Sequence, residues 1–187
     1  MKTFTSALAC PKCPKNKSNA QRTNSSKKKF EENSNSGYLL SSDVNNLEAD
    51  WKCSTCKFAV TSEKVATLTL KVKEESKKIE DMCFSEYYKS GTKPEGASSI
   101  NKHENFIKKH ENVTLHPNHV FLLDKKYTLA KMYGRMDGFT ANVMSDDLLR
   151  RKRILCEEVL AVFNKIMPGR TRKRGEMIRF VTHWLNC

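Results

Sequence analysis

The sequence has no long apolar run. No window in its 187 residues approaches the roughly 18 apolar residues that a membrane-spanning helix needs. The first residues also lack the apolar segment of a secretory signal peptide. We therefore predict a protein of the cytoplasm, the nucleus or both, with no membrane among its partners.

Acidic residues are scarce, since 21 Asp and Glu face 34 Lys and Arg and the formal net charge is +13. This surplus favours acidic partners, including nucleic acid and acidic proteins. A solvated basic surface is the simpler interpretation, because net charge governs association rather than fold. Any binding of nucleic acid is predicted to be weak and independent of sequence, through the basic runs 150–153 and 170–174.

Seven cysteines are present, and four of them form two C-x2-C pairs. The pairs are Cys10 with Cys13 and Cys53 with Cys56. Four thiolates in this pattern match the tetrahedral sulfur coordination that Zn²⁺ prefers, so we predict one structural zinc held by all four. Cysteines at this metal-binding spacing indicate a protein of a reducing compartment rather than one held together by disulfides. Of the remaining cysteines, Cys156 lies in an apolar helical pattern and is predicted to be a small buried hydrophobe.

The gap between the two pairs holds 39 residues, against about 15–20 in the usual pattern. Residues 14–36 are rich in Lys, Asn and Ser, which indicates a disordered insertion. Loop closure entropy grows slowly with length, so the insertion is compatible with the metal site. The lysines at 27–29 could form a localisation or nucleic-acid patch, although a solvated loop is favoured. Residues 1–60 are thus predicted to form a zinc ribbon, with a small core made of Tyr38, Leu39, Trp51 and Phe58.

From residue 61 the apolar residues recur at helical spacing. The pattern predicts a helix from 61 to about 88, whose apolar stripe is Val65, Leu68, Val72, Ile79 and Met82. Four further helices are predicted over 99–110, from about 117 to 136, from 145 to 167 and over 171–186. Short connections favour antiparallel hairpins stacked in a tetratricopeptide-like way. The predicted fold class is mostly α, with the N-terminal zinc ribbon followed by an antiparallel helical domain over 61–187, which we expect to be truncated.

The segment His116-Pro117-Asn118-His119 carries two histidines at i and i+3. Such a pair could ligate a metal, but no third ligand stands at a matching spacing. Pro117 suits the first turn of a helix, with Val120, Leu123 and Tyr127 facing inward after it. A structural helix start is therefore the favoured interpretation.

Four blocks of the sequence together resemble one known family. They are TSALACPKC at 5–13, ADWKCSTC at 49–56, LHPNH at 115–119 and YGR at 133–135. In this order they are similar to the SET and MYND domain-containing (SMYD) protein-lysine methyltransferases, and most of all to the arthropod branch. The resemblance implies that the four cysteines correspond to a zinc ribbon that follows the catalytic SET domain. It also implies that the helices correspond to the C-terminal domain that walls the substrate cleft.

The chain departs from that family in the parts that carry catalysis. The Gly-rich donor segment, the Asn-His pair and the catalytic tyrosine of the SET domain are missing, as are the post-SET cysteine cluster and the MYND finger. Neither Tyr127 nor Tyr133 is a credible substitute without a pocket for the methyl donor. We therefore predict no catalytic or cofactor-binding residue. The expected function is a non-catalytic fragment that binds zinc and a protein, either a histone or a non-histone substrate. The alternative is a zinc-ribbon nucleic-acid-binding, transcription-related protein.

Overall fold

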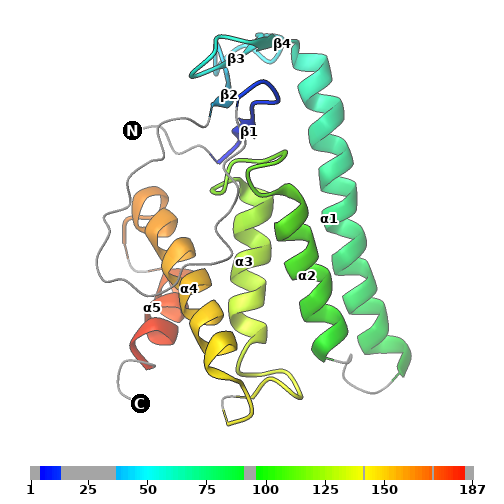
Figure 1. Cartoon of the computed structure of the whole chain (residues 1–187), viewed down its shortest axis with the longest axis vertical. Coiled ribbons are helices and arrows are strands. Elements are labelled where there is room, and N and C mark those ends of the chain that lie inside the picture. The colour runs from blue at the N-terminus through cyan, green and yellow to red at the C-terminus, as the bar shows by residue number, and fades with distance from the viewer. Residues whose placement is uncertain (1–4, 14–36, 91–95, 141, 170, 184–187) are drawn as a thin grey trace.

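The computed structural model describes residues 5–13, 37–90, 96–140, 142–169 and 171–183, without the side chains of 84–90 and 181–183. The predicted insertion 14–36, its lysine run and Cys187 lie outside the described residues. Five helices and one small sheet make up the described chain. The sheet lies over one end of the helices (Figure 1), so the predicted mostly helical fold with a small N-terminal sheet is confirmed.

The sheet is an antiparallel meander with the strand order β1-β2-β3-β4. The strands are β1 Leu8–Ala9, β2 Tyr38–Ser41, β3 Trp51–Cys53 and β4 Ala59–Val60. Leu39 is at its centre, paired with Leu8 on one side and Cys53 on the other, and all three are buried. Of the predicted ribbon core, Leu39 is buried and Trp51 and Phe58 are half-buried against the core cluster, whereas Tyr38 is half-buried against the ring of His116.

The helices run alternately up and down as a series of consecutive neighbours (Figure 1). They are α1 Ser62–Ser90, α2 Gly96–His110, α3 Val120–Met132, α4 Asp146–Ile166 and α5 Arg172–His183. Ile100, Phe106 and Ile107 of α2 are buried as predicted. Cys156 of α4 is fully buried, which confirms its prediction as a core residue. Within the described ranges, no helix combines the length and apolar character needed to cross a membrane.

The buried stripe of α1 is narrower than predicted. Val65, Val72 and Ile79 are buried, but Leu68 and Met82 are exposed at 39% and 44%. Ser76, which the apolar pattern passed over, is buried instead. The reason is that α1 packs mainly along one helix, α2, so only a thin stripe of its surface is covered.

The third helix differs most from its prediction. It begins at Val120 and ends at Met132, and Val120 is 53% exposed rather than inward. Lys125 and Lys126 are buried in its middle, next to Leu122 and Leu129. The helix packs between α2 and α4 and is covered on both sides, so apolar spacing alone could not show which residues face inward.

The buried lysines of α3 are paired with carboxylates from other helices and loops. Lys125 forms a salt bridge with Glu80 of α1. The Lys126 Nζ atom lies 2.5 Å from Glu111 and 2.8 Å from Glu158 of α4. These pairs satisfy the desolvated ammonium groups and connect α3 to α1 and to α4.

The sheet is attached to the loop between α2 and α3. The Ala9 amide donates to the Thr114 carbonyl at 2.9 Å, and the His116 amide donates to the Ala7 carbonyl at 3.1 Å. A single cluster of buried side chains continues from Leu8 into the helices. The predicted boundary at 60/61 falls between β4 and α1, and its role as a division between folding units stays a prediction.

Candidate metal centre

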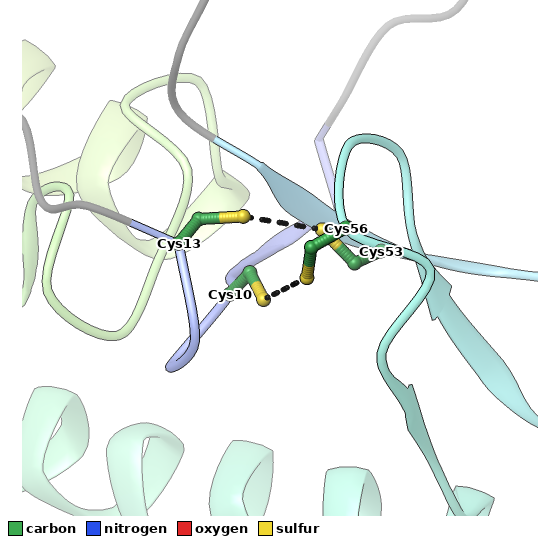
Figure 2. Close-up of side chains that lie close together, drawn as sticks. All are labelled: Cys10, Cys13, Cys53 and Cys56. Carbon is green, nitrogen blue, oxygen red and sulfur yellow. Dashed lines mark hydrogen bonds between the residues drawn. The ribbon is translucent and has the colours of Figure 1, made fainter.

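Four cysteine sulfurs converge beside the sheet. The Sγ atoms of Cys10, Cys13, Cys53 and Cys56 all lie within 4.8 Å of one another, and the side chains point toward a common centre (Figure 2). Two of the separations are 3.6 Å, between Cys10 and Cys56, and 3.7 Å, between Cys13 and Cys53. Sulfurs at the corners of a tetrahedron around Zn²⁺ would be about 3.8 Å apart, given a Zn–S distance of about 2.3 Å. The four cysteines are close enough to hold a metal ion.

Strand and turn geometry brings the two pairs together. Cys10 follows β1 directly, and Cys13 lies in the turn after it, whereas Cys53 ends β3 and Cys56 lies in the turn before β4. The second turn closes where the Cys53 amide donates to the Phe58 carbonyl at 2.8 Å. Lys57 adopts a left-handed conformation with φ of 61°, which reverses the chain after Cys56. The turn thereby presents two sulfurs on the side of the first pair.

Gly37 leaves the space that the sulfurs occupy. A Cβ atom at this position would lie 2.4 Å from the Sγ atoms of both Cys13 and Cys53, a separation that would force the chain to move. The Cys10 amide donates to the Gly37 carbonyl at 3.0 Å, so the same residue also positions the first pair. No prediction from the sequence assigned Gly37 to the site. The one signal that could have indicated this role is its position immediately before β2.

Burial and backbone hydrogen bonds shift the pKa values of the thiols in opposite directions. Burial, followed by contacts with the other sulfurs, raises the pKa of Cys13 to about 12, and burial also raises that of Cys10. Burial opposes ionisation of Cys53 as well, but the backbone N–H groups of Cys56 and Thr55 outweigh it and lower its pKa to about 7. One thiolate therefore forms readily, while its neighbours resist a second negative charge. A bound cation would remove that resistance, as expected for a metal-ligating thiol cluster.

The surroundings of the cluster suit a structural metal. Cys10, Cys13 and Cys53 are buried, and Cys56 is exposed at the rim. Phe58 packs beside the second pair, with the Lys12 ammonium 4.4 Å from the centre of its ring. Sulfur donors alone and a largely closed shell are typical of structural zinc sites, whereas catalytic zinc sites keep an open position.

His119 begins a helix as its N-cap, the interpretation that the sequence favoured, and His116 lies in the turn before it. The Nδ1 atom of His116 accepts from the Asn118 amide at 2.9 Å, and that of His119 accepts from the Phe121 amide at 3.3 Å. Burial lowers the pKa of each to about 4, so both are neutral near pH 7. His119 is the N-cap of α3, and Pro117 precedes the cap rather than lying in the first turn. Within the described part of the chain, the four cysteines form the one cluster suited to a metal.

The predicted basic run on α4 is held mostly in internal contacts. Arg151 makes a two-pronged pair with Glu104, at 3.0 and 2.8 Å, and Arg153 pairs with Glu157 at 2.7 Å. Lys152 is buried, with its ammonium 4.8 Å from the centre of the Phe180 ring. The prediction that this run presents four cations to phosphates is therefore wrong for Lys152, because helix packing turns its side chain inward.

Comparison with models of protein families, with curated proteins and with solved structures finds no match for this chain.

Proposed function

We propose that the four cysteines hold one structural Zn²⁺ and that the chain is a non-catalytic helical platform for a protein partner. The observation that carries this proposal is the convergence of four sulfurs within 4.8 Å, from two turns far apart in sequence. Four thiolates complete the coordination of zinc and leave no position for a substrate. The metal would therefore stabilise structure rather than supply chemistry.

The zinc would fasten the sheet at the place where it meets the helices. β1 is two residues long, and its outer edge is bonded to the loop between α2 and α3. A metal bound to Cys10 and Cys13 would tie the end of this short strand to β3 through Cys53. So small a sheet is marginal without a metal or similar reinforcement.

The arrangement of the helices is an argument for the tetratricopeptide-like platform in this proposal. Successive helices pack as antiparallel neighbours, and the sheet lies over one end of the helices (Figure 1). The order of zinc ribbon and then helices also supports the proposed similarity to the SMYD methyltransferases. In that proposal the partner is a histone or another protein substrate, and this chain selects the partner without transferring a methyl group.

A zinc ribbon that itself binds nucleic acid has less support. In the described ribbon, the basic and acidic residues are equal in number: Lys12, Lys52 and Lys57 against Asp43, Glu48 and Asp50. A nucleic-acid surface is normally a patch of surplus positive charge. The net charge of the chain must therefore reside outside the described ribbon.

Metal content tests the proposal most directly. Elemental analysis of the purified full chain should give one zinc per chain, and Cys53→Ser should lose it because a four-sulfur shell cannot close with three. Cys83→Ser is the matched control, since Cys83 lies on α1 away from the cluster. A metal-free wild-type chain with an intact sheet, or full zinc retention by Cys53→Ser, would contradict the proposal.

The non-catalytic part of the proposal has its own test. Calorimetry with the methyl donor S-adenosylmethionine should give no binding heat with the zinc-loaded chain, and a labelled donor should not modify a pool of histones and other proteins. Binding at micromolar concentration would refute that part and leave the zinc site untouched.

A further inference from the structure

Helix α5 gathers exposed positive charge near the end of the described chain. Its sequence holds four basic residues and a single acidic one, Glu176. The neighbouring α3 and the turn after it bring two more cations beside it. We call these six residues the α5 basic face: Lys131, Arg135, Arg172, Lys173, Arg174 and Arg179.

Aromatic rings hold part of this face in place. The ammonium groups of Lys131 and Lys173 lie 5.2 and 5.5 Å from the centre of the Tyr127 ring. The guanidinium of Arg135 lies 5.2 Å from the centre of the Phe180 ring. Contacts of this type position a cation without neutralising it, so the positive charge remains available to a ligand. They also cover the rings, which are then poor platforms for stacking a base.

A shallow hollow of about 370 Å³ lies on the same face of α5, lined by Arg172, Gly175, Glu176 and Arg179. These positions have the i, i+3, i+4, i+7 spacing of one helix surface. Gly175 leaves the hollow open, because a Cβ atom there would meet nothing within 4 Å. Arg172 is 92% exposed, although it also contacts Glu176 at 3.2 Å. Guanidinium groups at two sides of a hollow suit a phosphate, because each guanidinium can donate to two phosphate oxygens at once.

The α4 run does not offer an equivalent surface. Its arginines face carboxylates, with Arg150 3.8 Å from Asp147, Arg151 on Glu104 and Arg153 on Glu157. On α5, Arg172 likewise pairs with Glu176, and Arg174 donates to Asn164 and to the Gly169 carbonyl, but Glu176 is the single carboxylate on this helix. Among the described helices, α5 therefore has the largest surplus of basic over acidic residues.

We propose that the α5 basic face binds the phosphate backbone of a nucleic acid and does not read its bases. A duplex carries about one negative charge per 1.7 Å of axis and releases condensed counterions when cations replace them. Six closely placed cations on two elements gain most from a ligand of that charge density. An acidic peptide lacks the condensed counterions and is expected to bind less tightly.

The test is fluorescence anisotropy of the zinc-loaded full chain with labelled nucleic acids at several salt concentrations. Two unrelated duplex sequences should bind equally, with log K falling against log salt at a slope of about −4, as four or five phosphate contacts require. A single strand, an RNA and an acidic peptide of equal charge form the comparison arms. The strand and RNA arms distinguish the form of nucleic acid, and the peptide should bind more weakly.

Two variants localise the site. Arg172→Ala with Arg179→Ala should make the salt slope shallower by about 2 and weaken binding about tenfold or more. Gly175→Gln should weaken binding by filling the hollow, and the backbone at this position has room for a side chain because a Cβ atom there meets nothing within 4 Å. Lys64→Ala with Lys71→Ala on α1 is the matched control, since it removes the same charge from exposed positions elsewhere.

The proposal is overturned if both α5 variants bind as the wild type does, or if the α1 control loses as much affinity as the double α5 variant. It is also overturned if the acidic peptide binds as tightly as nucleic acid. A strong preference for one duplex sequence would have the same consequence, since the face is proposed to contact phosphates alone.

Discussion

Gly37 matters to the candidate metal centre because it has no side chain. We expect Gly37→Ala to push the chain away from the Cys13 and Cys53 sulfurs, since the added Cβ atom would lie 2.4 Å from each. Overpacking of this kind costs about 1–3 kcal/mol, so zinc affinity should fall about ten- to a hundredfold. Competition with a chromophoric chelator measures that loss.

The matched control for this change is Gly175→Ala. The same methyl group would be added to α5, where it meets nothing within 4 Å, so zinc affinity should be unchanged. Equal zinc affinities of the wild type and Gly37→Ala would show that the site does not depend on the absence of a side chain at residue 37.

The buried histidines at the start of α3 predict a pH dependence of stability. Burial lowers the pKa of His119 to about 4, below its ordinary value of 6.5. The unfolded chain then binds more protons than the folded chain between these values, so stability falls as pH drops from about 6.5 toward 4. A tenfold change in the acid dissociation constant corresponds to about 1.4 kcal/mol, so this residue accounts for a loss of up to about 3 kcal/mol. Urea unfolding at several pH values measures it.

His119→Asn is the informative comparison. The asparagine side chain can still accept the Phe121 amide as an N-cap but cannot be protonated. The wild type should therefore lose stability relative to the variant as the pH falls. Any zinc release at low pH affects both proteins, so a difference that stays constant with pH would refute the prediction.

At the scale of elements, α3 is fixed by the pairing of its buried lysines. Lys126 is 2% exposed at its side chain and lies between Glu111 and Glu158. We expect Lys126→Met to destabilise the fold by about 2–4 kcal/mol in urea unfolding, because two partly buried carboxylates lose their shared cation. Adding Glu111→Gln and Glu158→Gln should recover much of that loss.

An exposed lysine pair provides the contrast to this prediction. Lys109 contacts Glu75 at 2.8 Å with its side chain 62% exposed, so Lys109→Met should cost less than about 1 kcal/mol. Similar losses for the two substitutions would mean that burial does not set the strength of the α3 pairs.

At the scale of the whole molecule, removal of zinc should separate the behaviour of sheet and helices. A strong chelator should expose the backbone amides of residues 5–13 and 37–60, because four short strands with a small core are expected to be only marginally stable once the metal is lost. The helices pack on one another through α2, α3, α4 and α5 and should keep most of their far-ultraviolet circular dichroism. Hydrogen exchange with and without chelator measures the protection of both parts. Equal protection of the sheet in the two states would contradict a structural role for the metal.

Local patterns in the sequence were sufficient for several features. The C-x2-C spacing predicted which four cysteines lie together, because each turn places two sulfurs on one side. The apolar periods predicted the existence and order of five helices, and the predicted start of the fourth at 145 coincides with the N-cap of α4, Ser145. The start of α3 near His119 followed from the Pro117 segment. Each of these depends on interactions within a few residues, so the sequence alone carries the information.

Other features were decided only when distant segments met. Gly37 belongs to the site because β2 brings it against sulfurs from two other turns. Lys126 is buried because α3 lies between two helices and finds Glu158 on one of them, whereas its charge indicated an exposed position. Leu68 is exposed because α1 packs mainly on α2, which covers only a narrow stripe of its surface. Burial depends on which elements pack together, and the apolar period of one helix does not show how many other elements cover that helix.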